Sequence, residues 1–208
     1  MSTAVLLVLA VMAVSITIYI ARHRDAAGRA NFLRQAGFAI TAVFGGFFGL
    51  LLAGESISDP GGLESAGLIA AWAIPLTVLI LLAWRRQIWA GQVLLFLVGL
   101  DVAVNFWFLA DSGSWRALEN NIGPVRAIYL FVLGSALAVY GLSRTLPAGL
   151  MLLVAGVAPT ALAYQNRAGL SSLALASAAP LITGALYLTS AAITNTIDPP
   201  ERQGTQQP

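Results

Sequence analysis

This chain has no cysteine, no lysine and a single histidine, and these absences exclude several classes of protein. Without cysteine it has no disulfide, no thiolate metal site and no cysteine-ligated iron–sulfur cluster. Without lysine it cannot form the Schiff base through which a rhodopsin holds retinal. The one histidine, His23, cannot supply two haem ligands or a histidine-rich metal centre. We therefore expect no cofactor and no bound metal.

Charge is also scarce. Charged residues make up 10% of the 208 residues, against about a quarter in soluble domains. Hydrophobic residues make up 58%, and the mean hydropathy is +0.82. All 11 cations are arginines, and they are dispersed along the chain rather than gathered in one patch, so no nucleic-acid partner is expected. The composition predicts that membrane lipids surround this protein.

Seven apolar runs account for most of the chain, each close to the roughly 20 residues that a helix needs to cross a bilayer. We place the spans at residues 4–21, 36–54, 67–84, 88–110, 127–142, 148–164 and 172–193. The predicted fold is all-α, a polytopic seven-transmembrane-helix bundle forming one domain over residues 1–194. The polar, proline-bearing residues 195–208 predict a disordered cytoplasmic tail. The first span is followed, not preceded, by basic residues, so we expect it to stay as an anchor.

Arginine accumulates in alternate connections between the spans, which predicts their orientation because arginine and lysine favour cytoplasmic loops. The connections assigned to the inside contain Arg22, Arg24, Arg29, Arg34, Arg85, Arg86, Arg144 and Arg202, and those assigned to the outside contain Arg116, Arg126 and Arg167. The N-terminus should face out and the C-terminus in, in a bacterial cytoplasmic (inner) membrane. The short connections at 85–87 and 143–146 predict that the spans they join are antiparallel neighbours.

Asp101 is the one acid deep inside an apolar run. A carboxylate at mid-bilayer costs about 2.5 to 3.5 kcal/mol on insertion scales, so such residues are candidates for function. Asn105 lies one helical turn later and shares the same face. The alternative is a structural role, in which a protonated Asp101 hydrogen-bonds to a neighbouring helix.

Counting residues from the predicted span ends, at about 1.5 Å per residue, places several hydroxyls and the three mid-span prolines near the level of Asp101. A proline frees a backbone carbonyl that must find a partner inside the membrane. We expect a polar ligand-binding pocket here, with Glu55 as an acid at its outer entrance. The candidate residues are Asp101, Asn105, Ser135, Thr160, Thr183 and Glu55. Ordinary helix kinks, packing contacts and a solvated boundary acid are the alternative.

Small residues recur at intervals of four, as in Gly45-x-x-x-Gly49 and Gly134-x-x-x-Ala138. Such spacing allows two helices to approach closely. It fits either a homo-oligomer interface or packing within the bundle, and the latter is the simpler interpretation with six other helices available.

Residues 59–64, 84–86, 115–116 and 123–127 resemble a group of actinobacterial multi-pass membrane proteins with no assigned activity. This resemblance implies a bacterial membrane location and transfers no functional residue. Catalytic patterns are absent, since there is no Gly-x-Ser-x-Gly motif and no histidine base within a span.

We therefore expect a non-enzymatic protein that binds or translocates a small or lipid-like molecule through the pocket around Asp101. One alternative is an accessory subunit that packs against a membrane-protein partner. A second is an enzyme that modifies a membrane lipid or isoprenoid, with Asp101 and Glu55 as acids. The sequence indicates neither the ligand nor a direction of transport.

Overall fold

The computed structural model describes residues 25–58, 62–111, 113, 125–166 and 170–197. Within these ranges every regular element is an α-helix, which confirms the all-α expectation. The helices are α2 (Ala26–Ser58), α3 (Gly62–Arg85), α4 (Gln87–Ala110), α6 (Val125–Gly141), α7 (Thr145–Asn166) and α8 (Leu170–Ile197). The predicted first span and the residues after 197 lie outside the described residues.

The helix boundaries follow the apolar runs to within a few residues, with one exception. Helix α2 begins at Ala26 rather than at the predicted residue 36. The Asp25 side chain caps this helix, because its Oδ1 accepts a hydrogen bond from Gly28 N at 3.1 Å. Residues 26–35, predicted as a connection, are therefore helical in spite of Arg29 and Arg34. At the other end of the chain, α8 continues to Ile197, beyond the predicted domain boundary at 194.

Two helical segments of the described chain are long and apolar enough to cross a membrane, namely Gln87–Trp107 and Ser177–Ile197. Three further apolar segments are shorter, at Ile69–Arg85, Ile128–Gly141 and Thr145–Ala161. These findings weakly support membrane association, and seven crossings stay a prediction.

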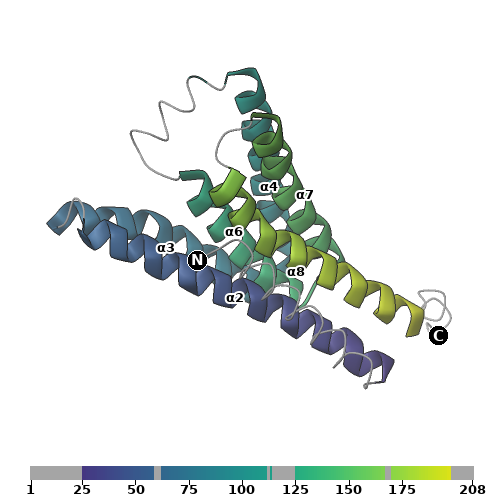
Figure 1. Ribbon diagram of the computed structural model, residues 1–208. Coiled ribbons are helices and arrows are strands. Elements are labelled where there is room, and N and C mark those ends of the chain that lie inside the picture. Colours follow the sequence, from purple (N-terminus) through teal and green to yellow (C-terminus); the bar gives the residue numbers. More distant parts are fainter. Residues whose placement is uncertain (1–24, 59–61, 112, 114–124, 167–169, 198–208) are drawn as a thin grey trace.

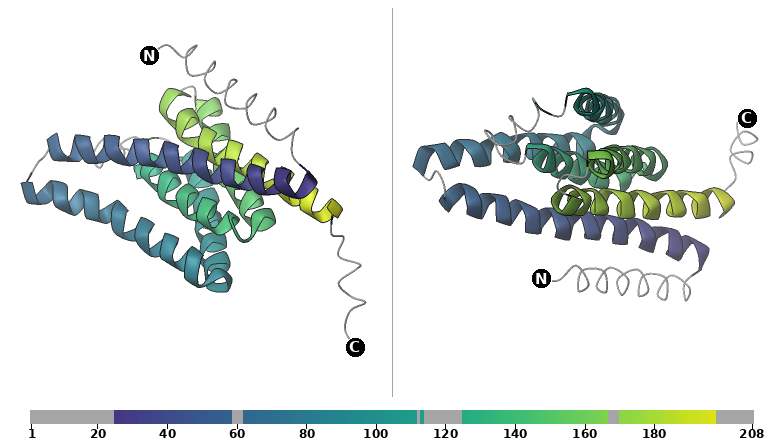
Figure 2. Two further views of the ribbon diagram at one scale, coloured as in Figure 1. Left: turned by 90° about the horizontal axis from the view of Figure 1, so that it is seen from below. Right: turned by 45° about the horizontal axis from the view of Figure 1, so that its top comes forward.

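Helix α6 lies at the centre of the molecule and contacts every other described helix. Helix α8 packs along α7 on one side and α2 on the other (Figures 1 and 2). The end of α2 and the start of α3 lie near each other at one end of the molecule, and the two helices run side by side from there (Figure 2). Helix α4 leaves α3 at a steep angle rather than as the antiparallel neighbour expected from the short connection (Figure 1).

The core is built around α6, and its largest fully buried side chain is Tyr187 of α8. The Tyr187 hydroxyl donates a 2.7 Å hydrogen bond to the backbone oxygen of Ala138. Its ring occupies space left by two glycines. A Cβ added at Gly37 would lie 2.9 Å from the ring, and one added at Gly141 would overlap it. These glycines therefore allow α2, α6 and α8 to meet around one aromatic ring.

The small-residue motifs are used in packing between helices of the same chain. A Cβ at Gly45 would lie 2.7 Å from Phe131 Cε2 of α6. Outside these motifs, a Cβ at Gly184 of α8 would lie 3.0 Å from the backbone oxygen of Gly149 in α7. Both glycines mark places where two helices of this chain approach closely.

Candidate functional site

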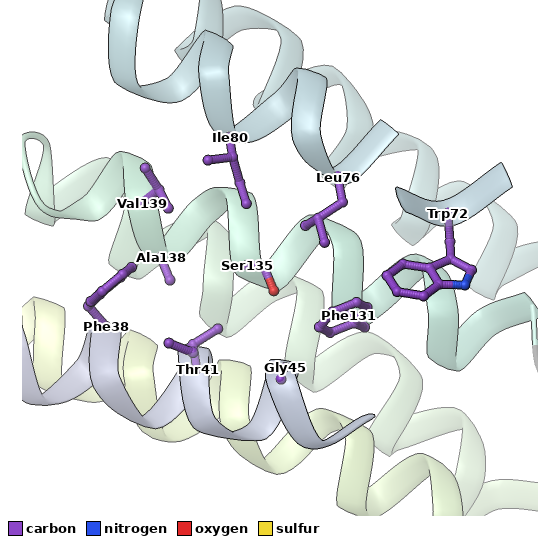
Figure 3. A pocket seen from close by; sticks show the side chains of 12 residues that line it. Phe38, Thr41, Gly45, Trp72, Leu76, Ile80, Phe131, Ser135, Ala138 and Val139 are labelled. Atoms are coloured by element: carbon purple, nitrogen blue, oxygen red, sulfur yellow. The ribbon is translucent and has the colours of Figure 1, made fainter. Parts of the chain in front are cut away.

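A pocket of about 520 Å³ lies between α2, α3 and α6 (Figure 3). Its walls are apolar except for two hydroxyl-bearing side chains, Thr41 and Ser135. Among the described residues that line it, none is charged: Phe38, Thr41, Ala42, Gly45, Gly46, Trp72, Leu76, Ile80, Phe131, Ser135, Ala138 and Val139.

Helical spacing explains how each element forms its wall. Trp72, Leu76 and Ile80 recur every four residues and so present one face of α3. Apart from Phe38, the α2 wall carries small residues, which leaves the space open. Gly46 has no atom within 4 Å of the position that a Cβ would occupy, whereas its neighbour Gly45 is closely packed against Phe131.

Two aromatic rings stand at one end of the pocket. The centroids of Trp72 and Phe131 are 6.0 Å apart and their planes meet at 69°, an edge-to-face arrangement (Figure 3). Such pairs add about 0.5 to 1.5 kcal/mol beyond the area that they bury. They fix α3 against α6 at this end.

The hydroxyl of Thr41 links the pocket to α8. Thr183 Oγ1 donates to the backbone oxygen of Gly37 at 3.0 Å, and it lies 2.7 Å from Thr41 Oγ1. A hydroxyl has one proton and can accept at its lone pairs. Since Thr183 has given its proton to Gly37, Thr41 is the donor in the Thr41–Thr183 bond. Thr41 can therefore still accept a hydrogen bond from the pocket side.

Ser135 is the predicted site residue that lines this pocket, and its Oγ points into the space between α6 and α2 (Figure 3). A Cβ at Gly45 would lie 3.1 Å from this oxygen, so the two helices are in close contact here. Thr183 is buried behind Thr41 and reaches the pocket only through that residue. Ser135 of α6 and Thr41 of α2 thus bring two hydroxyls to one pocket, and Thr183 of α8 bonds to Thr41 behind it.

The other predicted residues do not join this group. Asp101 and Asn105 are buried on α4, with 7% and 4% of their surfaces exposed, and neither lines the pocket. Asn105 Nδ2 donates to the backbone oxygen of Asp101 at 2.8 Å. One turn before Asp101, the Tyr129 hydroxyl of α6 donates to Leu97 O at 2.7 Å. The two predicted α4 residues thus belong to a separate, α4–α6 region of the interior.

Thr160 is also absent from the described lining of the pocket. Thr160 Oγ1 donates to Gly156 O in its own helix at 2.7 Å. Glu55 lies near the end of α2, and its side chain is outside the described residues.

Thr41 lines the pocket but is not among the site residues predicted from the sequence. The helical spacing could have identified it, because Thr41 precedes Gly45 and Gly49 by four and eight residues and so shares the face of the small-residue motif.

The arrangement can bind a molecule through apolar contacts and hydrogen bonds. Its described lining residues offer hydroxyl groups and apolar volume. In the part of the chain that the structure describes, no cluster of three or more histidine, cysteine, aspartate or glutamate side chains could hold a metal ion. Comparisons with protein-family models, curated proteins and solved structures gave no match. The size and lining of the pocket are therefore the basis for assigning a function.

Proposed function

We propose that this chain is a non-enzymatic, multi-pass bacterial membrane protein that binds or translocates a small or lipid-like molecule in the pocket between α2, α3 and α6. The observation that carries the proposal is the pocket itself. Its volume of about 520 Å³ is within the range of roughly 300 to 1,000 Å³ that is typical of small-molecule sites. Its mostly apolar walls with a few hydroxyls are also typical of such sites. This pocket differs from the Asp101-centred pocket expected from the sequence, which stays a prediction.

The proposal includes seven crossings with the N-terminus outside and the C-terminus inside. The start of α2 and the end of α8 lie together at one end of the molecule, and the end of α2 and the start of α3 lie at the other (Figures 1 and 2). Arg29 and Arg34 belong to the first turns of α2. Arginine at this end of α2 supports a cytoplasmic location for it.

Mass spectrometry of bound molecules tests the binding function. The protein is purified from its native membrane in mild detergent, and the small molecules that it retains are identified. We expect the wild type to retain a molecule that Gly46→Leu loses, because the added side chain would occupy pocket volume. Gly99→Leu on α4 is the matched control, since Gly99 is also exposed, has no atom within 4 Å of its Cβ position and does not line the pocket. Equal retention by all three proteins would refute binding in this pocket.

The accessory-subunit alternative is favoured by a different observation. Helix α4 exposes a series of large apolar side chains, among them Trp89, Phe96 and Trp107. In a membrane this face contacts either lipid or another protein. A protein that co-purifies with the wild type and is lost on Phe96→Ala would support the subunit role. The pocket does not support the enzymatic alternative, because Asp101 is not among its lining residues.

A further inference from the structure

We infer that the occupant of this pocket is an uncharged lipid chain, acyl or isoprenoid, which enters sideways from the bilayer between α2 and α3. The inference rests on the proposed function and specifies its ligand class and its route. Three features of the pocket support it: the shortage of polar partners, the absence of charge in the lining and the position of the opening.

Water is a poor occupant of this space. A volume of about 520 Å³ has room for on the order of ten or more water molecules, each of which needs two to four polar partners. The lining side chains offer chiefly the hydroxyls of Thr41 and Ser135. Cavities with apolar walls stay dry or take apolar ligands, so a hydrocarbon chain is the favoured occupant.

A charged group is equally disfavoured inside. None of the described lining side chains carries a charge that would pair with a phosphate, carboxylate or ammonium group. Placing an unpaired charge in such surroundings costs several kcal/mol or more. A lipid headgroup would therefore stay outside while its chain occupies the pocket. A hydroxyl or carbonyl on the chain could hydrogen-bond with Ser135 Oγ.

The opening of the pocket lies among side chains that would face lipid. Of the lining residues on α2, Ala42 and Gly46 are exposed. On the opposite side of the opening, Leu76 and Ile80 of α3 are half-buried. The outward faces of both helices are apolar as well, with Phe47 of α2 and Ile74 of α3 59% and 61% exposed. In a membrane the apolar opening therefore continues into the acyl region, so a chain can enter without passing through water.

Fluorescence quenching of Trp72 by brominated lipid tests the inference. In the full-length protein the other four tryptophans, Trp84, Trp89, Trp107 and Trp115, are replaced by phenylalanine. This protein is reconstituted into phosphatidylcholine vesicles with dibrominated acyl chains, because bromine quenches tryptophan only at short range. We expect Gly46→Leu to lower the quenched fraction roughly twofold, because its side chain takes the space of the lipid chain. Gly99→Leu should leave the quenched fraction unchanged.

Quenching that is the same in the parent protein and in Gly46→Leu would overturn the inference. Should Gly46→Leu lose helicity by circular dichroism, Ala42→Leu decides instead, since Ala42 is an exposed lining residue of the same wall. Different results refute the binding function and the lipid chain as its ligand. A polar molecule retained by the wild type and lost with Gly46→Leu, together with unchanged quenching, refutes the lipid and leaves pocket binding standing. No response in either experiment refutes both.

Discussion

Tyr187 shows how one residue determines the approach of three helices. Its ring fills space left by Gly37 of α2 and Gly141 of α6, and its hydroxyl bonds to Ala138 O. The side chain belongs to α8, so all three helices are fixed around it. Aromatic side chains bury large areas, and a buried phenolic hydroxyl requires a partner. Both conditions are met at this position.

Gly141→Ala should destabilise the protein strongly. The new methyl group would overlap the Tyr187 ring, and overpacking of this kind costs about 1 to 3 kcal/mol. Thermal unfolding in detergent, followed by circular dichroism, measures the effect. Gly99→Ala is the control and should unfold at or above the wild-type temperature, because its methyl group enters open space and alanine favours helix. Equal midpoints for the two variants would contradict the packing described for Tyr187.

Asp101→Asn should leave ligand binding unchanged. Asp101 is buried on α4 but does not line the pocket between α2, α3 and α6. The measurements are retention of the bound molecule on purification and quenching of Trp72 by brominated lipid. Loss of either signal in Asp101→Asn, with helicity preserved, would return the site to the Asp101-centred pocket that the sequence predicts.

The interface between α2 and α8 uses hydrogen bonds as well as packing. Ser190 Oγ donates to Ala30 O at 2.7 Å, one turn or more from the Thr183–Gly37 and Thr41–Thr183 bonds. All of these groups are buried within the pair of helices. Such bonds specify the register of α8 along α2, because sliding one helix by a turn would leave each hydroxyl without its partner.

Thr41→Val and Thr183→Val should show coupling in a double-mutant cycle. Each variant removes one partner of the same hydrogen bond, so their effects on the free energy of unfolding should not add. We expect a coupling energy of about 0.6 kcal/mol, the average for hydrogen bonds between membrane helices. Thr189→Val replaces Thr183→Val in the control cycle, because the Thr189 hydroxyl bonds to Ala185 O in its own helix. Strict additivity in the first cycle would show that the bond contributes nothing.

The sequence predicts where most of the helices begin and end along the chain, but not which faces of the helices contact one another. Arg86 and Asp111 bound an apolar run, and α4 spans the residues between them, Gln87–Ala110. The start of α2 was missed because Arg29 and Arg34 interrupt the apolar run, although Asp25 caps a helix that continues through them. Counting residues along spans estimates the depth of a side chain but not the direction in which it points. Ser135 and Asp101 were therefore grouped by depth, whereas only Ser135 faces the pocket.

At the scale of the whole molecule, the chain is well suited to a direct test of membrane topology. It has no cysteine, so a single introduced thiol is the only one that a maleimide can modify. Ser143 lies in the connection between α6 and α7, and Gly113 lies beyond the end of α4. Both residues are exposed, and the proposed orientation places them on opposite sides of the membrane.

An impermeant maleimide should modify Gly113→Cys in intact cells and Ser143→Cys only after the membrane is permeabilised. The physical reason is the accumulation of arginine in the connections assigned to the inside. The cysteine-free wild type is the control for background labelling. Labelling of both positions from the same side would mean that the segments between them do not cross the membrane an odd number of times, and the seven-span topology would be wrong.

Thr41 belongs both to the pocket wall and to the hydrogen bonds between α2 and α8. Occupation of the pocket and separation of these helices are therefore linked equilibria, and each must affect the other to the same extent. A guest that accepts the proton of Thr41 must replace the Thr41–Thr183 bond, so it binds less tightly than its contacts alone would allow and raises the melting temperature less. A guest that only fills hydrocarbon volume leaves this bond intact and raises the melting temperature more. The size of the thermal shift, compared between wild type and Thr183→Val, thus reports which atoms of the guest contact the wall.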